Sequence, residues 1–224
     1  MKISMMSYTI ARGEWGQNPD IVSLCELTKE LGLEAIDWVS TYGKDPDEIV
    51  RITGDYGIKN CCHTFGARLQ VADEKERAAA IDVVKEGLET AAKLGTDKVM
   101  VVLSGIPGVP REETRTYAID SLQKVVPMGQ EMGIAVSVEH FPGATSPFAI
   151  SADMNEAIAQ VPGLKITYDN GNVFIGGEPM KPATNRLRGL LYSSKGAPTC
   201  SMLPAFSTTI LSAMVMASTW SCVT

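Results

Sequence analysis

The sequence alternates short apolar runs with helical segments, and the same unit repeats six times. Apolar runs that predict strands lie at 2–10, 33–39, 58–65, 98–103, 134–141 and 164–169. Between them, apolar residues recur three and four positions apart, as on one face of a helix. Several of these helical segments end in a glycine shortly before the next run, as at Gly95 and Gly133. Strands and helices that alternate in this way form parallel βα units.

Two architectures are consistent with this pattern: an open doubly wound sheet and an eight-stranded barrel. No GxGxxG motif follows the first run, which removes the commonest dinucleotide-binding version of the open sheet. Polar residues gather where the predicted strands end, namely at Asp37, His63, Glu139, His140, Asp169 and Asn170. Barrels in particular place their sites at these ends. We therefore predict an α/β fold of the (β/α)8 TIM-barrel type, incomplete, with about six βα units.

Composition and charge limit the class of partner. The 224 residues are 45% hydrophobic and 21% charged, which is typical of a globular domain. The formal net charge of −6 argues against a general nucleic-acid or anionic-membrane binder, because either partner would repel the chain. The five cysteines form no CxxC pair or zinc spacing, and no segment resembles a signal peptide. We therefore expect reduced thiols and a cytoplasmic location.

The composition changes abruptly after Glu178, which is the last acidic residue. All 26 Asp and Glu residues precede this point, and the β/α alternation stops there. We therefore divide the chain into a partial barrel, residues 1–178, and an atypical tail, residues 179–224. A disordered tail and a membrane-inserting segment at 203–223 are alternatives. We favour an out-of-frame translation, because a complete barrel needs about 250 residues and two more βα units.

Glu139 and Asp169 are the main candidates for chemistry. Glu139 ends an apolar run. Because burying an unpaired charge is costly, a carboxylate at this place is expected to form a salt bridge, to bind a metal or to act in catalysis. Asp169 ends the next run, and neighbouring parallel strands lie about 4.8 Å apart, so the two carboxylates would approach one divalent ion. Without a cation they would repel, and one pKa would rise. Turn formation is the alternative role for the Asp-Asn-Gly-Asn segment at 169–172.

Two further polar residues end predicted strands. His63 ends the third run, where a substrate contact and a satisfied structural histidine are both open. Asp37 ends the second run, and for this residue we favour an ion pair that faces a helix over a role in a site.

The segments Val138-Glu139-His140-Phe141-Pro142 and Tyr168-Asp169-Asn170-Gly171-Asn172 resemble those of the xylose isomerase-like TIM barrels, the sugar phosphate isomerases and epimerases. The resemblance covers about residues 1–178 and includes His63. It implies metal-assisted proton transfer next to the carbonyl of a small sugar or sugar phosphate. It also implies that Glu139 is a catalytic acid/base, that Glu139 and Asp169 bind Mn²⁺, Mg²⁺, Zn²⁺ or Co²⁺, and that His63 binds substrate.

The sequence also departs from this family, which supplies a metal-binding His from its seventh strand and a second catalytic Glu from its eighth. This chain has only two histidines, His63 and His140, and no Glu after 178. We therefore expect weak metal binding and impaired activity, and whether the chain is an enzyme stays open.

A degenerate, non-catalytic sugar- or metal-binding domain is one alternative. An endonuclease IV-like phosphodiesterase is another, disfavoured by the few histidines and the negative charge. Open strand edges would favour poor solubility or pairing between copies.

Overall fold

The computed structural model describes residues 3–8 and 20–178, and it contains the six predicted strands. They are β1 (Met5–Met6), β2 (Ala35–Val39), β3 (Lys59–Gly66), β4 (Lys98–Val102), β5 (Ala135–Glu139) and β6 (Lys165–Thr167). All neighbours pair in parallel, in the order β1-β2-β3-β4-β5-β6. The predicted fold class is thus confirmed: the strands form an incomplete TIM-barrel-like sheet. The tail at 179–224, with the boundary and the membrane segment expected there, lies outside the described residues.

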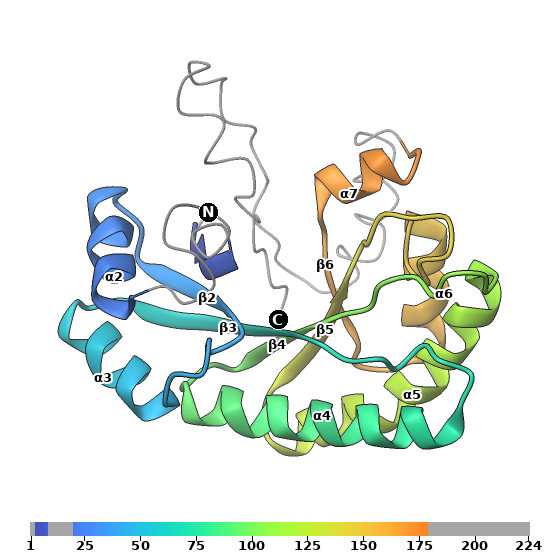
Figure 1. Ribbon diagram of the computed structural model, residues 1–224, viewed down its shortest axis with the longest axis horizontal. Helices are drawn as coiled ribbons and strands as arrows, with labels where there is room; N and C mark the ends of the chain where they lie inside the picture. The colour runs from blue at the N-terminus through green and yellow to red at the C-terminus, as the bar shows by residue number, and fades with distance from the viewer. Residues whose placement is uncertain (1–2, 9–19, 179–224) are drawn as a thin grey trace.

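Helices connect the strands and lie along the outside of the curved sheet, and a last short helix follows β6 and lies beyond its end (Figure 1). They are α2 (Ile21–Glu30), α3 (Pro46–Asp55), α4 (Glu74–Lys93), α5 (Arg111–Glu131), α6 (Ser151–Gln160) and α7 (Asn170–Ile175). None of these helices is both long and apolar enough to cross a membrane. The first strand is shorter than its apolar run predicts, because only Met5 and Met6 pair with β2.

Local sequence explains where the helices begin and end. Asp20, Asp45 and Asp73 each accept a hydrogen bond from a backbone N–H in the first turn of the following helix. Such caps satisfy N–H groups that have no partner within the helix. After α4 the chain turns at Gly95 with φ +69°, and after α5 at Gly133 with φ +71°. A residue without a Cβ adopts this left-handed conformation at little cost, so each helix stops where the next strand must start.

The two faces of the sheet differ in character. Val99, Val101, Val136 and Val138 are at most 1% exposed and pack with apolar residues of α4, α5 and α6 in one core. Successive strand residues point to opposite faces, so the residues between these valines point to the interior of the barrel. Glu139 directly follows Val138 and therefore belongs to the interior face. The helices cover one face of the sheet, and the interior face carries Asp37 and Glu139.

Candidate active site

Glu139 is a half-buried carboxylate without a basic partner among the described residues. It forms no salt bridge and no hydrogen bond with any residue that the structure describes, so the structural ion pair considered for it is not present there. Burial raises the pKa of Glu139 to about 8, and the charges of Asp169 and Asp37 add to the rise. A carboxyl group in this state can both donate and accept a proton near neutral pH.

Asp169 lies just beyond the end of β6, the strand beside Glu139, at the same end of the sheet. Glu139 pairs in register with Thr167, and Asp169 follows Thr167 by two residues, which returns it to the same face. Asp169 Oδ1 also accepts a hydrogen bond from the backbone N–H of Asn172 at 2.8 Å and so caps α7. The Asn172 side chain donates to the carbonyl of His140 at 2.7 Å, which ties α7 to the end of β5. The 169–172 segment thus begins a helix, and Asp169 faces Glu139.

Asp37 corrects one of our expectations, because it does not form an ion pair facing a helix. Ile36 and Trp38 pack in the core beside α2 and α3, so Asp37 between them points to the interior. Asp37 Oδ1 accepts a hydrogen bond from Thr64 Oγ1 at 3.0 Å, and Oδ2 is buried without a hydrogen-bond partner among the described residues. Burial raises the pKa of Asp37 to about 7, against the opposing effect of hydrogen bonds from the Thr64 and Cys62 side chains.

His63 lies on the opposite face from these carboxylates. It pairs in register with Trp38 and Val99, and both of these belong to the helix-covered side. Its Nδ1 donates to the Trp38 carbonyl at 3.1 Å, and its ring lies 5.2 Å from that of Phe65. Burial lowers the pKa of His63, so the ring is neutral at physiological pH. The substrate contact that the sequence suggests for His63 stays a prediction, and the described contacts hold the ring within the helix-facing layer.

His140 is a buried residue to which the sequence assigns no role. It follows Glu139, and its ring lies edge-on to that of Tyr168, which packs against the helix-side core, at 5.5 Å. Neither ring nitrogen has a hydrogen-bond partner of good geometry among the described residues. Burial lowers the pKa of His140 to about 4, which outweighs the opposite effect of the Glu178 charge. In the sequence it is one of the polar residues at the strand ends, directly after Glu139.

The residues present fit part of a divalent-metal site. Glu139 and Asp169 offer carboxylate oxygens, which are the ligands that Mg²⁺ and Mn²⁺ prefer. The oxygens of Glu139 have no hydrogen-bond or ion-pair partner among the described residues. The negative charge of Asp169 is close enough to help raise the pKa of Glu139. Among residues 3–8 and 20–178, no three His, Cys, Asp or Glu side chains lie close enough together to hold an ion. Water or substrate would have to supply the other ligands, as is common for Mg²⁺.

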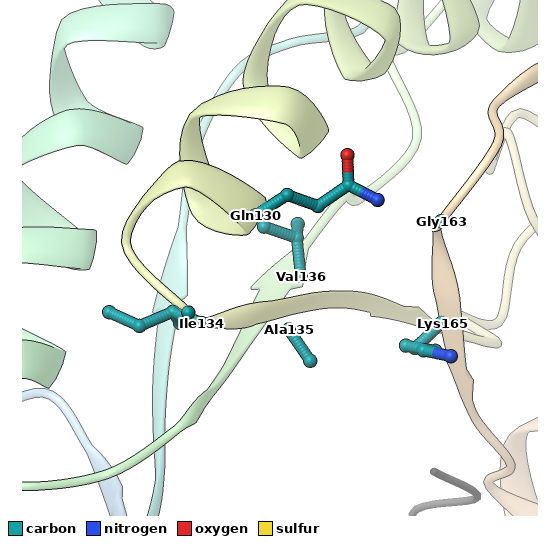
Figure 2. Close-up of a pocket in the computed structure, with 7 residues that line it drawn as sticks. Gln130, Ile134, Ala135, Val136, Gly163 and Lys165 are labelled. Carbon is teal, nitrogen blue, oxygen red and sulfur yellow. The ribbon is translucent and has the colours of Figure 1, made fainter.

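A hollow of about 240 Å³ lies at the other end of the sheet (Figure 2). It is lined by Gln130, Gly133, Ile134, Ala135, Val136, Gly163 and Lys165. These residues surround the points where β5 and β6 begin. Conserved chemistry in barrels belongs to the carboxyl ends of the strands, so this hollow is not the candidate active site.

A comparison with protein-family models shows to which family this chain belongs. The model of the xylose isomerase-like TIM barrel matches residues 25–194. This chain belongs to the xylose isomerase-like TIM barrel family. Among curated proteins, none matches the sequence significantly.

Solved structures agree with the family's fold. D-psicose 3-epimerase from Clostridium cellulolyticum H10, solved with D-tagatose, matches with a TM-score of 0.71 and 15% identity over 83% of this chain and 69% of that one. The IOLI protein with a bound zinc atom matches with a TM-score of 0.69 and 17% identity over 81% and 67%. An AP endonuclease of family 2 from Brucella melitensis matches with a TM-score of 0.68 and 16% identity over 84% and 76%. At these identities the likeness establishes the barrel fold.

Proposed function

We propose that this chain is built for proton transfer next to the carbonyl of a sugar or sugar phosphate, as an isomerase or epimerase, and that its activity is weak. The observation that carries the proposal is the half-buried Glu139 carboxyl on the interior face, which has no ion-pair or hydrogen-bond partner among the described residues and lies near Asp169, just beyond the end of β6. A buried carboxyl with a raised pKa is suited to take a proton from a carbon and return it. Membership of the xylose isomerase-like family supports this reaction class.

The residues have distinct roles in the proposal. Glu139 removes the proton from the carbon next to the carbonyl and returns it, and with Asp169 it would hold a divalent ion. That ion, when bound, would polarise the carbonyl oxygen and so lower the pKa of the proton on the neighbouring carbon. The hydrogen bond between Asp169 and the Asn172 N–H keeps the Asp169 carboxylate fixed at the end of β6. The substrate contact that the resemblance implies for His63 stays a prediction and is not part of this scheme, because its ring packs on the face opposite Glu139.

Weak activity follows from the small number of protein ligands. Two carboxylates are the whole donor set that the described residues bring together. The sequence has no histidine after His140 and no glutamate after Glu178 to act as a further ligand or as a second acid. These observations equally favour a second candidate, a non-catalytic domain that binds a sugar or a metal. An endonuclease-like phosphodiesterase remains disfavoured, because zinc clusters of that kind need several histidines and DNA needs a basic surface.

Metal binding and proton exchange test the proposal separately. We expect Mn²⁺ to bind measurably, by the loss of its free electron-spin signal, and Glu139→Gln and Asp169→Asn each to weaken binding by about tenfold or more. Asp120→Asn is the matched control, because Asp120 is exposed on α5. In D₂O with Mn²⁺, slow deuterium incorporation into a ketose such as D-fructose should disappear in Glu139→Gln. Binding of sugar or Mn²⁺ without any exchange would favour the non-catalytic domain, and equal Mn²⁺ affinity in all four proteins would refute the site.

A further inference from the structure

A second cavity lies at the same end of the sheet as Glu139 and Asp169. Its volume is about 320 Å³, and it is lined by Arg111, Gly143, Ala144, Ala149, Ile175 and Gly176. Gly143 comes four residues after Glu139, and Ile175 ends the helix that Asp169 caps. The walls are therefore segments that continue directly from the carboxyl ends of β5 and β6.

Among the described residues, Arg111 is the one charged residue that lines this cavity, and its guanidinium donates no hydrogen bond to them. Arg111 Nε is buried without a hydrogen-bond partner among the described residues. The nearest carboxylates are Asp153, whose Oδ2 lies 3.8 Å from Arg111 Nη1, and Glu112, whose Oε1 lies 4.0 Å from Nε. Both distances are too long for a hydrogen bond. The guanidinium thus keeps donors for a further group.

Asp153 does not need Arg111, because other donors already satisfy it. Asp153 Oδ1 accepts from Arg115 Nη1 at 2.9 Å. Its Oδ2 accepts from two backbone N–H groups that precede α6, at 3.0 and 3.1 Å. The Glu112 side chain is 68% exposed, and an exposed ion pair at such a distance contributes about 1 kcal/mol or less. Arg111 is thus paired with Asp153 and Glu112 by charge, and its N–H donors are not used by hydrogen bonds to them.

The shape and chemistry of the cavity define the class of ligand. Arginine binds phosphate and carboxylate groups through paired N–H donors, more strongly where water is partly excluded. Glycine and alanine line most of the remaining wall, so the backbone lies close and no side chain of opposite charge enters from Gly143, Ala144, Ala149 or Gly176. We propose that this cavity is an oxyanion site, and that it holds the phosphate group of a sugar phosphate. The oxyanion site stands on the cavity alone, whereas its use by a substrate rests on the proposed function.

Calorimetric titration of the full chain with inorganic phosphate tests the site without turnover. We expect saturable binding that Arg111→Gln weakens at least tenfold and Arg111→Lys weakens less, because lysine keeps the charge without the paired donors. Arg51→Gln is the matched control: the Arg51 side chain is 66% exposed on α3 and, among the described residues, forms an ion pair with Asp55 alone, at 3.6 Å. Amide shifts of Gly143, Ala144 and Gly176 on adding phosphate to the unaltered chain give a readout that survives if Arg111→Gln fails to fold.

Competing ligands identify the group that is held and separate the two proposals. D-fructose 6-phosphate should bind more tightly than D-fructose or gluconate, and the Arg111→Gln change should remove the difference. Tighter binding of gluconate would overturn the phosphate assignment in favour of a carboxylate. Phosphate affinity that is unchanged in Arg111→Gln, or phosphate that shifts none of the cavity amides, would overturn the site. If phosphate binds as expected while no proton exchange occurs, only the proposed function fails.

Discussion

Asp37 and Glu139 are acidic side chains held inside the barrel without a basic partner among the described residues. Ordinary folding physics disfavours this arrangement, because burying an unpaired carboxylate costs far more than leaving it in water. Both groups respond by a raised pKa, to about 7 for Asp37 and about 8 for Glu139. Groups kept in this state cluster at functional sites, because a proton carrier needs a pKa near the working pH.

The raised pKa of Asp37 predicts a pH dependence of stability with a definite sign. Between about pH 4 and pH 7, Asp37 is ionised in the unfolded chain and protonated in the folded one, so the folded state binds more protons. The free energy of unfolding therefore falls as pH rises, by at most about 1.4 kcal/mol per pH unit from this group. Asp37→Asn should remove this contribution to the pH dependence. The free energy of unfolding of Asp37→Asn, measured in urea and compared with that of the unaltered chain, should therefore increase from pH 4 to pH 7. Asp120→Asn should keep the slope, and a parallel pH profile for Asp37→Asn would contradict the assignment.

At the level of elements, the alternation of strands and helices was predictable, but the direction of each side chain was less so. Aspartate caps and terminal glycines are local signals, and they place the helices correctly. The face of Asp37 was predicted wrongly, although Ile36 and Trp38 on either side already indicated that the large apolar groups face the helices. The face of His63 depends on its register with Trp38 and Val99, which sequence separation does not reveal.

The contact between α4 and β3 offers a test of how tightly an element is packed. A Cβ added at Gly87 would overlap the Phe65 ring, whereas a Cβ at Gly54 in α3 meets nothing within 4 Å. Gly54→Ala should stabilise by about 0.5–1 kcal/mol through helix propensity alone. Gly87→Ala should lose that gain and destabilise by about 1–3 kcal/mol, because a well-packed core resists an extra group. Urea unfolding of both variants checks this, and equal stabilisation by the two changes would show that the Phe65 ring moves freely.

At the scale of the whole molecule, the described sheet is open. β1 and β6 each pair on one side only within the described residues, whereas a closed barrel leaves no edge. Phe174 and Ile175 on α7, next to β6 in sequence, are 66% and 68% exposed. The same ends of the strands carry the two carboxylates and the Arg111 cavity, so whatever completes the sheet also affects the site.

An open sheet of this kind predicts association between copies of the chain. Unpaired strand edges offer N–H and C=O groups to a second copy, and exposed apolar side chains add to the tendency. Sedimentation velocity over a range of protein concentrations should show dimers or larger species that increase with concentration. A double change, Phe174→Ser with Ile175→Ser, separates the two causes: association through strand edges should persist, whereas association through α7 should be lost. A chain that stays monomeric at every concentration and unfolds cooperatively would contradict this prediction, because its edge backbone groups would then be covered by the rest of the chain or satisfied by water.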